Sequence, residues 1–197
     1  MDSDRNRMLV FVVFMIGVTL WRTWETFRKQ GNVRGQTSML WSFYALFAFS
    51  CVIFLGTIAE FFWVKRPWSL PVAVSGMVLF VLANGLRMVA IRTLGKFWSL
   101  HIEIREQHPF VRTGVYAYLR HPAYASFVLE AVAVPLVGNA WWSLAVAILG
   151  YVPLLLYRLK REDAALVAKF GEPYRAYQRE VGALLPKWPS RAGSSLR

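Results

Sequence analysis

Long apolar segments bounded by basic and aromatic residues are the feature of this chain that most restricts its fold. They lie at about residues 8–24, 39–63, 70–91 and 124–157. About 20 apolar residues cross a bilayer as a helix, and the last segment is long enough to cross it twice. Pro135, Gly138 and Asn139 interrupt that segment and indicate a tight helical hairpin. We therefore predict an all-α integral membrane bundle of about five transmembrane helices, with spans four and five forming the hairpin.

The composition agrees with a membrane protein. Hydrophobic residues make up 56% of the chain and charged residues only 17%, and the mean hydropathy is +0.38. The net charge of +12 could indicate a nucleic-acid partner, but the basic residues flank apolar segments instead of forming a polar face. They are better explained as topology signals and as contacts to anionic membrane lipids, so no nucleic-acid partner is expected.

The distribution of basic residues predicts the orientation. With five spans, one side of the membrane receives the loop after the first span, residues 92–120 and the C-terminal region, which hold most of the Lys and Arg residues. The other side receives only Arg5, Arg7, Lys65 and Arg66. Because the basic side of a membrane protein faces the cytoplasm, we expect a multi-pass protein with its C-terminal region in the cytoplasm.

Motifs for soluble cofactors and metals are absent from the sequence. It has no glycine-rich dinucleotide fingerprint and no phosphate loop. His101, His108 and His121 do not have the spacing of a zinc site, and the single cysteine, Cys51, lies in an apolar segment, so no metal is expected.

Two ionisable clusters next to apolar segments are the candidate site. Arg120 and His121 precede the hairpin, and Arg158, Glu162 and Asp163 follow it. A charge at a membrane boundary is costly unless it is solvated or paired, so such clusters are functional candidates. Since they bracket a hairpin, the fold can bring them together at one end of the bundle.

Three polar residues lie inside the spans, and their role stays open at this point. Asn84 and Arg87 are three residues apart on the third span and share a helix face. They either contact a ligand or pack the bundle, and Glu130 of span four is either a partner of Arg87 or part of an acceptor site. After the hairpin, residues 158–191 are expected to form an amphipathic helix followed by a loop. Its apolar face would comprise Ala165, Leu166, Phe170, Tyr174 and Tyr177.

Short motifs flank the hairpin on both sides. The first series holds His108, Phe110-Val111, Gly114-Val115-Tyr116 and Arg120 to Tyr124. The second holds Arg158, Glu162-Asp163, Leu166, Phe170-Gly171, Tyr174, Tyr177 and Leu185-Pro186. In order and spacing, these motifs resemble the isoprenylcysteine carboxyl methyltransferase family, membrane enzymes that use S-adenosylmethionine. The resemblance covers about half of the chain, roughly residues 94–188.

The resemblance implies which residues would do the chemistry. The implied cofactor-binding residues are His108, Val111, Gly114, Tyr116, His121, Pro122, Tyr124 and Glu162. The implied catalytic residues are Arg120, Arg158 and Glu162, with the two arginines directed toward carboxylates. Aromatic walls, hydrogen-bonding groups and a carboxylate suit the adenine and the cationic parts of S-adenosylmethionine. A lipophilic acceptor, prenyl or lipid-like, would enter from the bilayer.

A carboxylate acceptor fits this arrangement chemically, because it is already ionised near neutral pH and needs no general base. Two departures from the family pattern leave the acceptor open. The second acidic position is Asp163 instead of Glu, and Ala183 stands near a place where a basic residue is often found. The acceptor is therefore either a prenylcysteine carboxylate or another lipophilic molecule, and the oligomeric state is not predicted.

Two other functions compete with this interpretation. Sterol-reductase-like membrane proteins share the Arg-His-Pro-x-Tyr arrangement, found here at 120–124, but use NADPH and usually have more spans. A non-catalytic membrane scaffold would tolerate substitution of His121 and Glu162. For the division of the chain into regions, we expect spans one to three at 1–92, a catalytic region at 93–188 and a disordered tail at 189–197.

Overall fold

The structure is a computed structural model that describes residues 2–27, 36–38, 40–64, 66–95, 102–104 and 110–187. Its α-helices are α1 (Asp2–Phe27), α2 (Leu40–Trp63), α3 (Leu70–Leu94), α4 (Pro122–Gly138), α5 (Trp141–Val146), α6 (Val152–Phe170) and α7 (Glu172–Glu180). A 3-10 turn, η2 (Gly114–Ala117), precedes α4, and a π-helical turn, η3 (Ala147–Tyr151), joins α5 to α6. Strands β1 (Gln36–Ser38) and β2 (Ile102–Ile104) pair as a small antiparallel ribbon.

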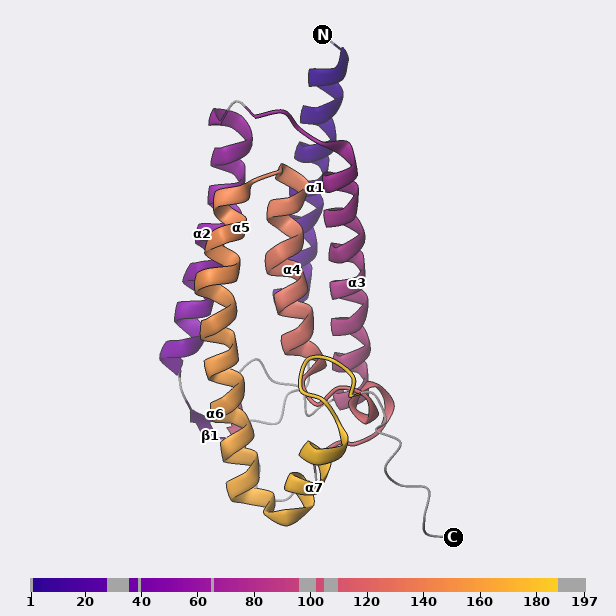
Figure 1. Cartoon of the computed structure of the whole chain (residues 1–197), viewed down its shortest axis with the longest axis vertical. Coiled ribbons are helices and arrows are strands. Elements are labelled where there is room, and N and C mark those ends of the chain that lie inside the picture. The colour runs from indigo at the N-terminus through magenta and orange to yellow at the C-terminus, as the bar shows by residue number, and fades with distance from the viewer. Residues whose placement is uncertain are drawn as a thin grey trace.

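The helical membrane bundle expected from the sequence is confirmed. Four helices are long and apolar enough to cross a membrane: Asp4–Glu25, Leu40–Trp63, Leu70–Leu94 and the continuous stretch Trp141–Phe170. The shorter apolar helix α4 runs beside them (Figure 1). The two-stranded ribbon was not foreseen, because each strand has only three residues.

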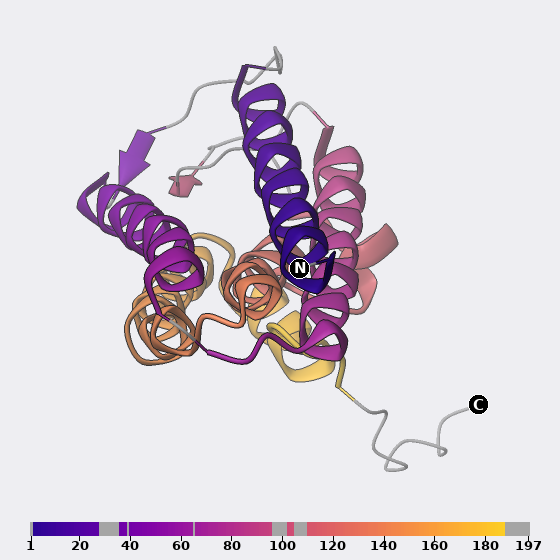
Figure 2. The same ribbon diagram turned by 90° about the horizontal axis from the view of Figure 1, so that it is seen from above.

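Helix α4 is the centre of the bundle. Viewed from above, α1, α2, α3 and the α5–α6 rod surround it (Figure 2). Most α4 side chains are buried, and many are small, including Ala123, Ala125, Ala131 and Ala133. Gly76 of α3 lets the two backbones approach, because a Cβ there would lie 2.8 Å from the Ala133 carbonyl oxygen. Small residues at helix contacts are the usual way in which membrane helices pack closely.

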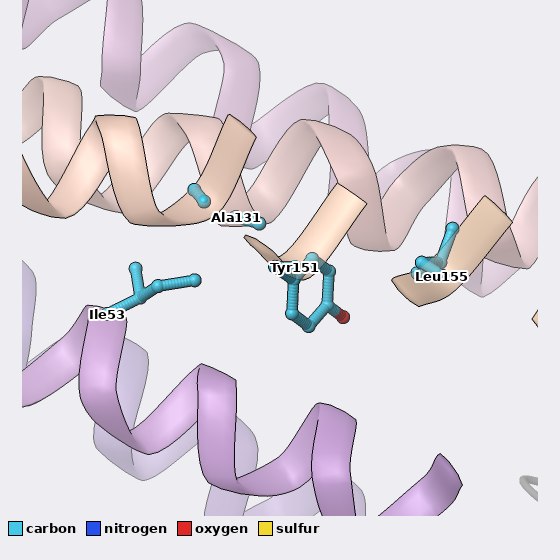
Figure 3. Close-up of a cluster of buried hydrophobic side chains, with 5 residues drawn as sticks. Ile53, Ala131, Tyr151 and Leu155 are labelled. Carbon is cyan, nitrogen blue, oxygen red and sulfur yellow. The ribbon is translucent and has the colours of Figure 1, made fainter. Parts of the chain in front are cut away.

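An apolar cluster joins α2, α4 and the α5–α6 rod. Ile53, Ala131, Ala147, Tyr151 and Leu155 are buried in it. Figure 3 shows Ile53 of α2 facing the chain that carries Tyr151 and Leu155. This contact holds α2 against the second arm of the hairpin, so that the N-terminal end of α2 lies beside α6.

The predicted hairpin is present, with two corrections. Asn139, in the left-handed conformation with φ 53°, ends α4, whereas Pro135 lies inside the helix and does not break it. The Asn139 side chain holds the turn, because its Oδ1 accepts a 2.9 Å hydrogen bond from the Ser69 backbone N–H.

The charged segment from Arg158 does not start a new helix but continues α6 to Phe170. A second helix, α7, follows after Gly171, so the expected single amphipathic helix is two helices.

A network of charges, buried at Arg87 and Glu130, fastens α1 to α3 and α4 and shows the role of the polar residues inside the spans. The Arg87 guanidinium contacts Glu25 at 2.7 Å and Glu130 at 2.6 Å, and it donates to the Asn84 side-chain oxygen. Arg22 of α1 pairs with Glu25 at 3.0 Å and also with Glu130. Two arginines and two glutamates thus balance one another, and Glu130 is the partner of Arg87.

Candidate functional site

The two ionisable clusters predicted from the sequence meet where α4 begins, beside the middle of α6. Figure 1 shows the start of α4 at the end of the bundle that faces α7. Asp163 of α6 connects them. Its Oδ1 lies 2.9 Å from His121 Nε2 and accepts a 2.6 Å hydrogen bond from the Tyr174 hydroxyl, and its Oδ2 accepts one from Arg120 Nη1 at 3.2 Å. One carboxylate therefore holds the start of α4, the middle of α6 and helix α7 together.

Glu162, the neighbour of Asp163, belongs to a second group of polar contacts. Its Oε2 accepts a 2.5 Å hydrogen bond from the Tyr124 hydroxyl, and its Oε1 lies 3.9 Å from His121 Nδ1. The Tyr124 hydroxyl in turn accepts a 3.1 Å hydrogen bond from Arg158 Nε. Tyr124 thus joins a carboxylate and a guanidinium that both come from α6, and places them on either side of one phenol oxygen.

The backbone before α4 is fixed by the segment that follows α7. The Arg120 N–H donates to the Gly182 carbonyl at 2.8 Å, and the His121 N–H donates to the Ala183 carbonyl at 3.0 Å. Pro122 then occupies the first turn of α4, where its missing N–H costs no helical hydrogen bond. These contacts explain why His121 and Tyr124 face α6 in a defined orientation.

The predicted residues of the 110–117 segment line the same end. Val111 is half-buried, and Gly114 opens η2 with φ 59°, a conformation that favours glycine. Tyr116 is buried, its carbonyl accepts a hydrogen bond from the Tyr177 hydroxyl, and its own hydroxyl is within electrostatic range of Glu162. His108 lies outside the described residues.

Tyr174 and Tyr177 pack as the sequence indicated, but Tyr174 also holds a site residue. Both are buried with Val181, and Phe110 contacts both rings from the segment before η2. Burial and the hydrogen bond to Asp163 raise the pKa of Tyr174 above its ordinary value, so this hydroxyl stays protonated and keeps donating. Burial also raises the pKa of Tyr177, to about 12.

The raised pKa of Tyr177 predicts how α7 responds to alkaline pH. The folded protein favours the neutral phenol of Tyr177. The contribution of this phenol to the free energy of unfolding is therefore complete below the ordinary pKa of 10.0, and it is lost as the pH rises through about 12. Titration followed by tyrosinate absorbance should show a late step in the wild-type protein that is smaller in Tyr177→Phe. A Tyr177 that ionises at its ordinary pKa would contradict the packing described for α7.

One buried polar atom at the site lacks a partner within the part of the chain that the structure describes. Arg120 Nε is shielded from solvent and has no hydrogen bond, although Nη1 of the same guanidinium binds Asp163. A buried N–H without an acceptor is costly, and guanidinium donors match carboxylate oxygens. The sequence predicted that Arg120 faces carboxylates: Nη1 binds that of Asp163, and Nε is a donor of the kind that matches a carboxylate oxygen.

Ser42 is a site residue that sequence reasoning did not identify. It lies near the start of α2, is fully buried, and its Oγ accepts a 2.9 Å hydrogen bond from Arg158 Nη1. The two residues are 116 positions apart in the sequence. A lone serine at the start of an apolar helix carries no motif, so only the packing of α2 against α6 could show it.

Known proteins are similar to this chain over the region that carries most of the candidate site. The model of the isoprenylcysteine carboxyl methyltransferase (ICMT) family matches residues 76–168. The chain is 30% identical over 115 residues to protein-S-isoprenylcysteine O-methyltransferase of Saccharomyces cerevisiae, covering 57% of this chain and 48% of that protein. It is 32% identical over 130 residues to methanethiol S-methyltransferase of Mycobacterium tuberculosis, covering 66% of this chain and 48% of that protein.

A shorter relative and a solved structure extend these matches. Uncharacterized protein YpbQ of Bacillus subtilis is 30% identical over 116 residues, covering 58% of this chain and 68% of that protein. The solved structure of the eukaryotic intramembrane Ras methyltransferase ICMT superposes with a TM-score of 0.61 at 23% identity, covering 71% of this chain and 51% of that one. The chain thus shares this fold, and it spans about half the length of the two named methyltransferases it matches.

Proposed function

Since this chain belongs to the isoprenylcysteine carboxyl methyltransferase family, we propose that it transfers a methyl group from S-adenosylmethionine to a lipophilic acceptor. The acceptor group we favour is a carboxylate of the prenylcysteine type, as in the name of the yeast relative. The observation that carries the proposal is the Tyr124 hydroxyl, which joins Glu162 and Arg158 at the end of the hairpin.

The residues present at the site fit the proposed donor. The unpartnered Nε of Arg120 suits the carboxylate of an amino-acid moiety, and the Glu162 carboxylate suits its cationic groups. The aromatic rings of Tyr116 and Tyr124 offer flat apolar surfaces beside these charges. When bound, S-adenosylmethionine supplies the electrophilic methyl group. His108, Val111, Gly114, His121 and Pro122 complete the proposed binding region.

Arg158 would orient the acceptor. Arg158 is 4% exposed, and its guanidinium can hold a carboxylate with little competition from water. Because a carboxylate is already anionic near neutral pH, no residue has to remove a proton from it. The contribution of the protein is then to align the two reactants and to exclude water, which can supply a large part of a rate enhancement. We infer further that this end of the bundle faces the cytoplasm, where a soluble donor is available.

Calorimetric titration of the full chain in detergent micelles with S-adenosylhomocysteine tests the donor, with NADPH as the competing cofactor. We expect saturable binding of S-adenosylhomocysteine and none of NADPH. Transfer of a radiolabelled methyl group from S-adenosylmethionine to N-acetyl-S-farnesyl-L-cysteine tests the acceptor. Binding of NADPH alone would favour a reductase, and binding of neither by folded protein would favour a scaffold.

A thiol acceptor is the second candidate, because the Mycobacterium tuberculosis relative is named as an S-methyltransferase. A thiol reacts as the thiolate and is mostly protonated at neutral pH (the cysteine thiol has an ordinary pKa of about 8.5), so its methylation should accelerate as the pH rises above neutrality. Methylation of a carboxylate should be independent of pH in the same range. Parallel assays with alkanethiols and with the farnesylcysteine therefore distinguish the two acceptors.

A further inference from the structure

The hydroxyl of Ser42 takes part in a contact between two helices of the bundle. Thr19, Ser50, Thr57 and Thr93 each donate to a carbonyl four residues earlier in their own helix. Ser42 is the third residue of α2. Its Oγ accepts a hydrogen bond from Arg158 of α6, a different helix, at 2.9 Å. A buried polar contact between membrane helices at this position needs an explanation beyond helix formation.

The contact matters because of what it does to Arg158. The guanidinium is held at two nitrogens by two different helices: Nε donates to Tyr124 of α4, and Nη1 donates to Ser42 of α2. A guanidinium is planar, so two bonds in different directions fix both its position and the orientation of its plane. Loss of the Ser42 bond would remove the contact that α2 makes with this guanidinium at Nη1.

We propose that Ser42 is a positioning residue that orients the Arg158 guanidinium toward the anionic group of the acceptor. This inference rests on the proposed function, since it assumes that Arg158 binds the acceptor. Ser42 lies outside residues 76–168, which the family model matches, so this part of the site comes from the N-terminal half of the chain. Helix α2 then contributes directly to recognition of the acceptor and does more than anchor the protein in the membrane.

A purely structural role predicts a different result. If Ser42 only stabilised the bundle, its removal would lower the fraction of active protein and hence the apparent kcat, while KM for the acceptor would not change. If Ser42 positions Arg158 for binding, its removal weakens ground-state binding and raises KM. The donor affinity would change little in that case, because the proposed charged contacts to the donor lie on Arg120 and Glu162 and not on Arg158.

The test measures kcat and KM with N-acetyl-S-farnesyl-L-cysteine, and the affinity for S-adenosylhomocysteine, in Ser42→Ala and Ser42→Cys. Cysteine has nearly the same shape but is a weaker acceptor, so it keeps the test valid if the alanine variant folds poorly. Thr57→Val is the matched control, because Thr57 is on the same helix, is equally buried, and donates to the Ile53 carbonyl of its own helix.

We expect Ser42→Ala to raise KM for the acceptor about tenfold, as loss of a hydrogen bond to a charged group implies, with kcat and donor affinity changed less than about twofold. Ser42→Cys should raise KM by less, and Thr57→Val should leave it unchanged. An unchanged KM in both Ser42 variants of an active enzyme would overturn this inference alone. A wild-type protein that binds S-adenosylhomocysteine but methylates no anionic lipophilic acceptor would overturn the proposed function and this role with it.

Discussion

Glu162→Gln is expected to weaken binding of S-adenosylhomocysteine by about tenfold to a hundredfold, the range that corresponds to the loss of a charged hydrogen bond. The substitution keeps the shape and a hydrogen-bond acceptor for the Tyr124 hydroxyl, so the 2.5 Å contact has a neutral replacement. The substitution removes the negative charge that, in our proposal, binds the cationic groups of the donor.

The loss should be larger for S-adenosylmethionine than for S-adenosylhomocysteine, because only the former carries a sulfonium charge. Competition between the two ligands, measured by calorimetry in the wild type and in Glu162→Gln, isolates this difference. Equal losses for both ligands would place Glu162 near the ammonium group alone.

Glu172→Gln serves as the matched control for this prediction. Glu172 lies at the start of α7, is solvent-exposed, and pairs at 2.6 Å with Arg179, which is exposed as well. Exposed ion pairs contribute little to stability, so this variant should bind both ligands as the wild type does. If the two glutamine variants bound the ligands equally well, Glu162 would have no role in holding the donor.

Arg87→Met is expected to lower the free energy of unfolding by about 3–5 kcal/mol, a large loss for a single substitution. Arg87 is almost completely buried and touches both carboxylates of the network, Glu25 and Glu130. Its removal leaves two glutamates with Arg22 as their common cation. A buried carboxylate without full compensation is costly in an apolar environment, which gives the expected sign and size.

A double substitution separates the cost of an unpaired charge from the value of the network. Arg87→Met combined with Glu130→Gln restores the balance of one arginine and one glutamate, so part of the lost stability should return. Thermal unfolding in detergent, followed by intrinsic fluorescence, measures both variants. Arg92→Met, at an exposed position of the same helix, is the control and should unfold as the wild type does.

The stability of Arg87→Met, whether it falls strongly or does not fall, shows what role the charge network has in holding α1. A large loss that the double substitution recovers would establish α1 as a helix fastened by charge. No loss in Arg87→Met would mean that the network does not hold α1. In both cases the site at Glu162 should still bind the donor if the protein folds, since none of the proposed donor contacts involves α1.

The location of the candidate site could be predicted because its residues are close together in two short segments. Arg120, His121 and Tyr124 lie within five residues, and Glu162 and Asp163 are neighbours. A hairpin of two membrane helices brings its two ends to the same side, so these segments had to meet. Which side chains each of the two acidic residues contacts did not follow from that argument. The structure places Asp163 with Arg120, His121 and Tyr174, and Glu162 with Tyr124.

The C-terminal region shows where periodicity misleads. Of the five apolar positions predicted to form one face of one helix, Leu166, Phe170, Tyr174 and Tyr177 gather in one cluster, and Ala165 does not belong to it. They belong, however, to α6 and α7, which meet at Gly171 with φ 62°. A helical repeat in hydrophobicity specifies which side chains are buried, but a turn at glycine can bury them equally well.

The sequence by itself determined the membrane class, the helical spans and the hairpin of this protein. Lipid offers backbone groups no hydrogen-bond partners, so a long apolar segment must become a helix, and this can be inferred locally along the chain. Only the tertiary structure decided the partners of the charged and polar side chains, such as Arg87 with Glu25 and Ser42 with Arg158. Those pairs depend on the depth and rotation of helices that are distant in sequence, and the local pattern of residues does not specify either quantity.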